Sequence, residues 1–159
     1  MGLKALRVLE ELEIWTKATT IEALLRIHRA SDKHFDDINI SACWSQLGKL
    51  SMQQAAERAW LQRNAEALEL LVQYTVQKAM AGEIDAREIA NVAYGVARSG
   101  VGQSWDSGTV AQPVTELFAV LAEAAERQIA DFNAQELANT VWAFATAGFP
   151  KAELFAVLA

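Results

Sequence analysis

The sequence predicts an all-α protein, a right-handed α-solenoid built from stacked helix pairs. Its 159 residues include 30 alanines, 8 glycines and 2 prolines, and 52% are apolar, which favours helices around one core. Apolar side chains recur at steps of three and four, the period of a helix. Stretches of sequence also recur along the chain, as in helical-repeat arrays. We therefore expect one helical-repeat domain over residues 1–159, with about eight or nine helices and no sheet.

The repeats define the expected helices. The heptapeptide at residues 116–122, ELFAVLA, returns at residues 153–159, 37 positions later. A longer unit begins at Phe35, Ile84 and Phe132, so its copies start 49 and 48 residues apart. Each copy of this unit predicts one helix, which we call an A helix. The A helices are expected near residues 36–50, 85–100 and 133–148.

Residues with capping chemistry mark the ends of the A helices. Asp36, Asp85 and Asn133 each follow the leading apolar residue, where a short polar side chain can accept from the free amides of the first turn. Gly100 and Gly148 follow two of the copies, as glycines do at helix C-termini. Each copy therefore carries its own start signal, and two carry a stop signal.

Between the A helices lie segments that predict return helices, near residues 20–29, 64–80 and 114–128, with a fourth beginning at Lys151. An inserted loop over residues 101–113 lengthens the last repeat. Trp105 in this loop is either an exposed contact for a base or partner, or an anchor that holds the loop on the helices. Because no polar cap follows the last helix, we expect a fragment of a longer array.

Charge and composition exclude several classes of protein. The net charge is −6, and residues 83–159 carry 10 acidic but only 4 basic side chains, which opposes phosphate binding by a free-standing nucleic-acid protein. No apolar run reaches the about 18–20 residues of a membrane helix, and no transit peptide is visible. The lone Cys43 and the histidines His28 and His34 give neither a metal site nor a nucleophile–base pair. The sequence therefore predicts no enzyme, cofactor, metal, membrane contact or small-molecule substrate.

Three stretches carry a family resemblance: LANTVWAFATAGF at residues 137–149, its weaker echo IANVAYGVARSG at residues 89–100, and the opening segment at residues 19–50. They resemble the helical repeats of FAST-kinase-like and octotricopeptide-type organellar proteins and of RNA-editing substrate-binding complexes. The resemblance implies an armadillo-like array that contacts organellar RNA, or holds subunits of an RNA-processing complex together, in a mitochondrion or chloroplast. It implies no kinase activity, since no Gly-rich, HRD-like or DFG-like element is present.

A polar stripe on the A helices supplies the candidate RNA-binding residues. After the leading apolar residue, steps of four and three residues select side chains that lie away from the buried stripe. The candidates are Lys49, Arg87, Asn91, Arg98, Gln135 and Asn139. Amides can hydrogen-bond base edges, and guanidinium groups can meet phosphate or stack on a base. Alternatively, the two asparagines bond backbone between repeats, and the other side chains are simply solvated.

The aromatic and acidic side chains have structural explanations. Trp44, Tyr94 and Trp142 occupy nearly matching places and are expected to fill the seams between helices, although Trp44 is slipped by one position. On that basis Trp142→Ala would cost roughly 3–5 kcal/mol and Thr146→Ala almost nothing. The acidic side chains of residues 10–13 and the Asp36–Asp37 pair are explained by solvated helix faces and N-cap chemistry.

Two functions remain open from the sequence alone. The first is a non-catalytic RNA-binding repeat module that contacts single-stranded RNA through the A helices. The second is a protein–protein interaction scaffold without RNA binding, consistent with the acidic second half of the chain. With Lys49, Arg87 and Arg98 as the only basic candidates, we expect weak RNA binding at physiological salt. The charge on the face formed by the A helices distinguishes the two functions.

Overall fold

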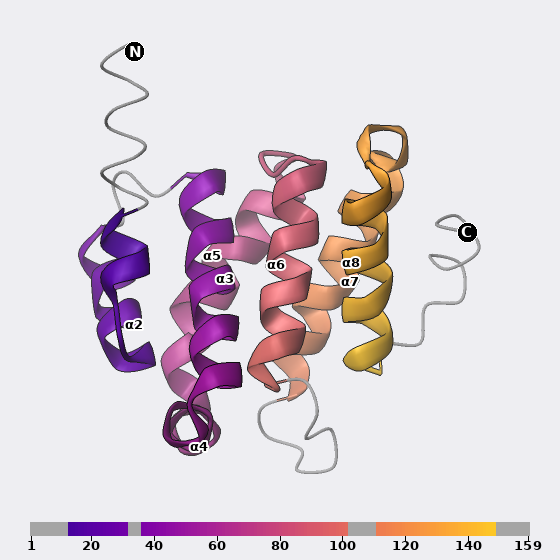
Figure 1. Cartoon of the computed structure of the whole chain (residues 1–159). Helices are drawn as coiled ribbons and strands as arrows, with labels where there is room; N and C mark the ends of the chain where they lie inside the picture. The colour runs from indigo at the N-terminus through magenta and orange to yellow at the C-terminus, as the bar shows by residue number, and fades with distance from the viewer. Residues whose placement is uncertain (1–12, 32–35, 102–110, 149–159) are drawn as a thin grey trace.

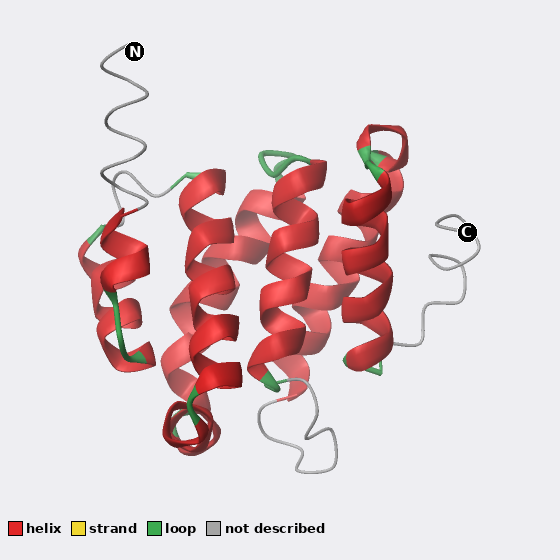
Figure 2. Cartoon of the chain, viewed as in Figure 1, coloured by secondary structure: helices red, strands yellow, loops and turns green. Residues whose placement is uncertain are grey.

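Helices make up almost all of the described chain (Figure 2). The computed structural model describes residues 13–31, 36–101 and 111–148, and no strand occurs in these ranges. Residues 13–17 are helical. The helices that follow are α2 (Ile21–Ala30), α3 (Asp37–Gln53), α4 (Ala55–Arg63), a 3-10 helix (Ala65–Leu68), α5 (Glu69–Met80), α6 (Ala86–Ser99), α7 (Ala111–Arg127), a second 3-10 helix (Ile129–Asp131) and α8 (Ala134–Thr146). The all-α prediction is confirmed for these residues.

The helices form two rows (Figure 1). The front row contains α3, α6 and α8, which correspond to the three predicted A helices; α3 packs on α6, and α6 packs on α8. Behind them α5 packs against α7, and α2 flanks α3. The helices α3, α6 and α8 run in the same direction (Figure 1).

The predicted N-caps of the front row are confirmed. The side chains of Asp36, Asp85 and Asn133 each accept a hydrogen bond from the amide three residues ahead, at 2.9, 3.3 and 2.8 Å. Each cap residue has extended backbone angles, whereas the residue that follows it is helical. The first turn of every front helix is therefore fixed by a local side chain, as the sequence indicated.

The C-terminal glycines also adopt the conformation that ends a helix. Gly100 is the C-cap of α6, with a φ of 75°, and Gly148 lies one residue beyond the C-cap of α8, with a φ of 66°. Left-handed backbone of this kind costs glycine little because it has no Cβ. The chain can therefore turn away directly after both helices.

Two segments differ from the expected boundaries. α7 begins at Ala111, so the last three residues of the loop predicted over 101–113 are helical instead. Pro113 is compatible with this because a first-turn residue needs no backbone N–H donor. The short helix α4 was not expected from the repeats at all. Trp105 and the helix expected from Lys151 lie outside the described residues.

The core is built from matching positions of the three front helices. Leu47, Val96 and Phe144, which correspond to one another in the repeated unit, are fully buried. Ile84 and Phe132, the leading apolar residues of two copies, are buried just before their N-caps. The leading residue of the first copy, Phe35, lies outside the described residues. Residues that correspond in the repeated sequence therefore also occupy equivalent packing positions in the structure.

Small residues let α3 and α6 approach closely. A Cβ added to Gly95 would lie 2.4 Å from the carbonyl oxygen of Trp44, and one added to Gly48 would lie 2.8 Å from the carbonyl oxygen of Gly95. Distances this short leave no room for a side chain, so the backbones themselves are in contact. This contact fixes the spacing of the two helices and the relative height of their side chains.

Candidate functional site

The six candidate residues lie on the front row of helices. Lys49, Arg87 and Gln135 are exposed, whereas Asn91, Arg98 and Asn139 are half-buried. On α6 the positions 87, 91, 94 and 98 are the only ones that are not buried, and they follow helical steps of four, three and four. We call the surface made by these positions and their equivalents on α3 and α8 the outer face. Its charged, amide and aromatic side chains are those of Lys49, Arg87, Asn91, Tyr94, Arg98, Gln135, Asn139 and Trp142.

Trp142 corrects one sequence prediction. It was expected in the core, but its side chain is 43% exposed, whereas Trp44 is fully buried. In the repeated unit Trp142 is equivalent to Tyr94 and to Ser45, and Ser45 lies one position after Trp44. One residue along a helix rotates the side chain by about 100°, which is enough to move an indole from the outer face to the interior. The one-position slip was therefore the decisive signal.

The exposed aromatic ring is part of a row of stacked side chains. The Trp142 ring lies 4.9 Å from the ring of Tyr94, measured between centroids, and is tilted by 48°. The Arg98 guanidinium lies 5.2 Å from the centroid of the same Tyr94 ring, within cation–π range. The row crosses from α8 to α6, and Arg98 continues it toward α3, where its Cβ lies next to Gly48.

The outer-face asparagines are not used to hold the fold. Neither Asn91 nor Asn139 makes a side-chain hydrogen bond to another residue within the described ranges, so the alternative that they bond backbone between repeats is not supported there. Other amides do serve this purpose: Gln46 donates to the carbonyl of Ala18, and the Gln128 amide donates to the backbone at Ile84. Within the described ranges, the packing of the repeats therefore does not depend on hydrogen bonds from these two side chains.

Charge divides the outer face along the helix axes. The acidic residues of the front row gather at the N-terminal ends, where Asp85, Asp131 and Glu136 line an open hollow of about 240 Å³ together with Arg87. Lys49 and Arg98 lie near the C-terminal ends of α3 and α6, without an acidic outer-face neighbour in the described part. The positive end is therefore the one that carries the aromatic row.

The thiol and imidazole predicted to be inactive are placed in the interior. Cys43 is fully buried, and burial raises the pKa of its thiol, which keeps it protonated and unreactive. His28 is buried and faces the Tyr74 ring edge-on, with ring centroids 6.1 Å apart. Glu13 is exposed and forms a 3.4 Å ion pair with Lys17 on its own helical turn. Glu10, Glu11 and His34 lie outside the described residues.

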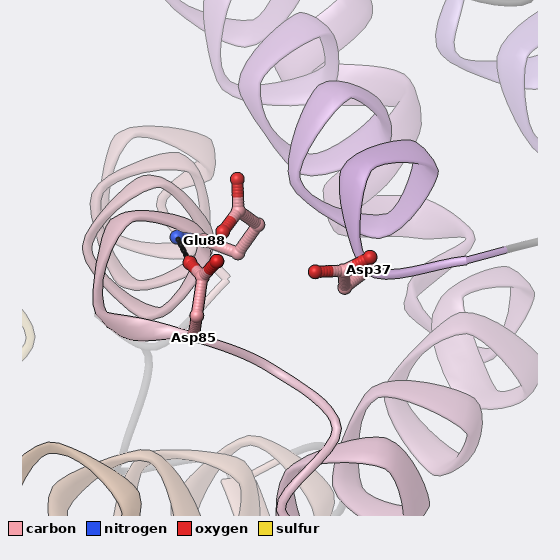
Figure 3. Close-up of side chains that lie close together, drawn as sticks. All are labelled: Asp37, Asp85 and Glu88. Atoms are coloured by element: carbon pink, nitrogen blue, oxygen red, sulfur yellow. Dashed lines mark hydrogen bonds between the residues drawn. The ribbon is translucent and has the colours of Figure 1, made fainter. Parts of the chain in front are cut away.

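A second group of side chains was not anticipated from the sequence. Asp37, at the start of α3, lies across from Asp85 and Glu88 at the start of α6 (Figure 3). One carboxylate oxygen from each residue lies within 4.8 Å of the other two. Burial raises the pKa of Asp37, and the negative charges of Asp36 and Asp85 add to the rise. Asp37 and Asp85 are 48 residues apart, so only the packing of α3 on α6 brings them together.

Comparisons of the chain with protein-family models, with curated proteins and with solved structures find no match. Among the described residues, no helix is long and apolar enough to cross a membrane.

Proposed function

We propose that the chain is a non-catalytic helical-repeat module that contacts single-stranded RNA on the outer face. In this proposal α3 to α8 form part of a right-handed α-solenoid, and the parent protein acts in RNA processing in a mitochondrion or chloroplast. The organellar setting is carried by the sequence resemblance alone. The RNA contact is also supported by the side chains of the outer face, above all by the row Trp142, Tyr94 and Arg98.

The chemistry of this row suits an unpaired base. Exposed indole and guanidinium planes stack on bases whatever their sequence, and single-stranded RNA presents bases that are free to stack. Trp142 is exposed although its ring is large and apolar, and it is supported from one side by Tyr94. A base placed on the other side of the indole would cover apolar surface that now faces water.

The charges favour a particular path for the strand. Lys49 and Arg98 supply positive charge near the aromatic row, whereas Arg87 shares its hollow with Asp85 and two other carboxylates. Phosphate groups are repelled by the acidic end and attracted to the basic end. We therefore place the strand across the C-terminal halves of α3, α6 and α8, with Asn139 and Asn91 within the same face to meet base edges.

Fluorescence anisotropy with a pool of short, labelled single-stranded RNAs tests this function. Trp142→Ala and Arg98→Ala should each weaken binding about fivefold or more, since stacking contributes about 1–3 kcal/mol per base. Arg87→Ala should weaken it less, because neighbouring carboxylates already offset that charge. Arg29→Ala on α2 removes the same charge outside the outer face and serves as the control.

The pattern of effects decides the proposal. Equal losses of RNA affinity in Arg29→Ala and Arg98→Ala would show that the chain attracts RNA by charge without a specific site. Unchanged affinity in Trp142→Ala would show that no base stacks on this indole. Circular dichroism of each variant keeps unfolding from being mistaken for lost binding.

A protein-binding scaffold is the second candidate function. The observation in its favour is the acidic back row: α7 carries Glu116, Glu123 and Glu126 against the single Arg127. An acidic surface of this kind suits a basic protein partner and opposes RNA. If the anisotropy of the labelled RNA stays the same on addition of the wild-type chain or of Trp142→Ala at low salt, this second function replaces the first.

A further inference from the structure

The carboxylates of Asp37, Asp85 and Glu88 form a group of like charges at the junction of α3 and α6. Glu88 is only 7% exposed, and its Oε2 atom accepts no hydrogen bond from any described residue. A buried carboxylate without a partner is costly, because it has lost its hydration and gained nothing in return. Figure 3 shows Asp37 reaching toward Asp85 and Glu88 from the facing helix, which adds repulsion to this cost.

The other two front helices handle the same positions differently. In α8 the capping residue is Asn133. The backbone N–H and the side-chain amide of Asn133 each donate a hydrogen bond to the Glu136 carboxylate, both at 3.0 Å. In α3 the roles are reversed: the amide of Asn39 donates to the Asp36 carboxylate at 2.9 Å. Both pairs combine one carboxylate with one amide donor.

The pair in α6 has no such donor. Asp85 and Glu88 are both carboxylates, so neither side chain can donate to the other while both are ionised. The Asp85 Oδ1 atom is used by the backbone N–H of Glu88 at 3.3 Å, which leaves its second oxygen for another contact. The Lys78 ammonium group is close enough to Asp37 to interact with its charge, but its ion pair is with Glu83. Among the described residues, no Lys, Arg or His side chain forms an ion pair with Asp37, Asp85 or Glu88.

From this arrangement we propose that Asp37, Asp85 and Glu88 bind one calcium-sized divalent cation between the N-termini of α3 and α6. All three ligands are carboxylate oxygens, the type that hard divalent cations prefer. The three oxygens lie within 4.8 Å of one another, which is compatible with oxygens bound to one ion at the Ca–O distance of about 2.4 Å. Ca²⁺ also accepts the irregular geometry of ligands that come from two helices, whereas Mg²⁺ demands a near-ideal octahedron.

The charge of the site also matches a divalent ion. Three carboxylates supply three negative charges, and the two helix N-termini together offset about one of them, at about half a charge each. About two negative charges remain, and water completes the coordination on the side of Asp85, which is exposed. Because the ligands come from two helices, the bound ion would hold α3 against α6.

Calorimetric titration of the chelator-treated full chain with CaCl₂ tests the site directly. We expect one Ca²⁺ per chain and weaker binding of Mg²⁺. Glu88→Gln and Asp37→Asn should each lower the Ca²⁺ affinity at least tenfold. Glu136→Gln changes the same helix position in α8, outside the group, and should leave the affinity within about twofold.

Thermal unfolding gives a second readout of the same site. Saturating Ca²⁺ should raise the unfolding temperature of the wild-type chain by a few degrees and that of Glu136→Gln by the same amount, whereas Glu88→Gln should not respond. In the absence of metal, Glu88→Gln should be more stable than the wild type because it removes the repulsion. No saturable heat with millimolar Ca²⁺, or an equal response in Glu88→Gln and Glu136→Gln, overturns the proposal.

Discussion

Trp44 connects the two rows of helices through one hydrogen bond. It is fully buried, and its Nε1 atom donates to the Thr75 hydroxyl on α5 at 3.0 Å. Trp142 has the same size but is 43% exposed and rests against the Tyr94 ring on one side. Two tryptophans of the same row of helices therefore have different roles, one in the core and one on the surface.

The first prediction follows from this difference in burial. Trp44→Ala should lower the free energy of unfolding by roughly 3–5 kcal/mol, because it leaves a cavity and removes the hydrogen bond to Thr75, whose hydroxyl keeps only its bond to the Leu71 carbonyl. Trp142→Ala should cost about 1 kcal/mol, the size of a surface ring contact, instead of the larger cost expected from the sequence. Urea denaturation of both variants measures the two costs. A larger loss for Trp142→Ala would mean that the indole is buried in solution.

The second prediction concerns the titration of Asp37. Burial raises the pKa of this carboxyl, with Asp36 and Asp85 adding to the rise, so the folded state binds a proton more tightly than the unfolded state. Its contribution to stability is complete below the unfolded pKa of about 3.9 and is lost as the pH rises through the folded pKa. Metal-free Asp37→Asn should therefore be more stable than the wild type near neutral pH, with a gain that shrinks as the pH falls through the folded pKa toward about 4.

Thermal unfolding over this pH range measures the gain from Asp37→Asn. Glu66→Gln, an exposed change on the first 3-10 helix, is the control for a lost negative charge far from the group. A gain in unfolding temperature for Asp37→Asn that is the same at acidic and neutral pH would show that the pKa of the Asp37 carboxyl is not raised in the folded chain.

At the scale of the helices, the contact between α3 and α6 depends on the absence of side chains. A methyl group at Gly95 would lie 2.4 Å from the Trp44 carbonyl oxygen, so the helices would have to move apart. We expect Gly95→Ala to destabilise the chain by about 1–3 kcal/mol, in spite of the better helix propensity of alanine. Ser45→Ala, an exposed change on α3, should stay within about 0.5 kcal/mol of the wild type. Equal urea midpoints for the two variants would contradict the close contact.

The helix ends show which features a sequence can reveal. Asp36, Asp85 and Asn133 were predicted as N-caps because capping depends on residues three positions apart, and a local pattern is visible in one sequence. α4 was not predicted, because it lies outside the repeated unit and its sequence has few buried positions; of its residues only Leu61 is buried.

Contacts between helices were harder to anticipate. Asp37 lies close to Asp85 and Glu88 because the N-termini of α3 and α6 lie side by side. The backbone contact at Gly48 and Gly95 sets this alignment of the two helices. The exposure of Trp142 depends likewise on a rotation of one residue, which sequence periodicity resolves poorly when neighbouring positions are all apolar or small. The charged and amide residues of the outer face were identified from the sequence because stripes of equal spacing on equivalent helices point the same way, whereas Tyr94 and Trp142 were assigned to the seams between helices.

At the scale of the whole molecule, the net charge of −6 acts against the basic end of the outer face. Of the basic side chains on the described outer face, Lys49 and Arg98 lie near the C-terminal ends of their helices, and Arg87 is partly offset by the carboxylates of its hollow. Binding to RNA would therefore depend on a few phosphate contacts together with base stacking. Long-range repulsion from the rest of the surface lowers the association rate, most strongly at low salt.

The final prediction is that this chain alone binds single-stranded RNA weakly at physiological salt. Two or three neutralised phosphates give a slope of about −1.4 to −2.1 in a plot of log affinity against log salt. Raising the salt from about 50 to 200 mM should then weaken binding by only about 7–18-fold. Anisotropy titrations at several salt concentrations measure this slope, and Arg98→Ala should reduce it by about 0.7, whereas Trp142→Ala should lower the affinity without changing the slope. Submicromolar binding with a much steeper slope would mean that basic residues beyond the outer face contact the RNA.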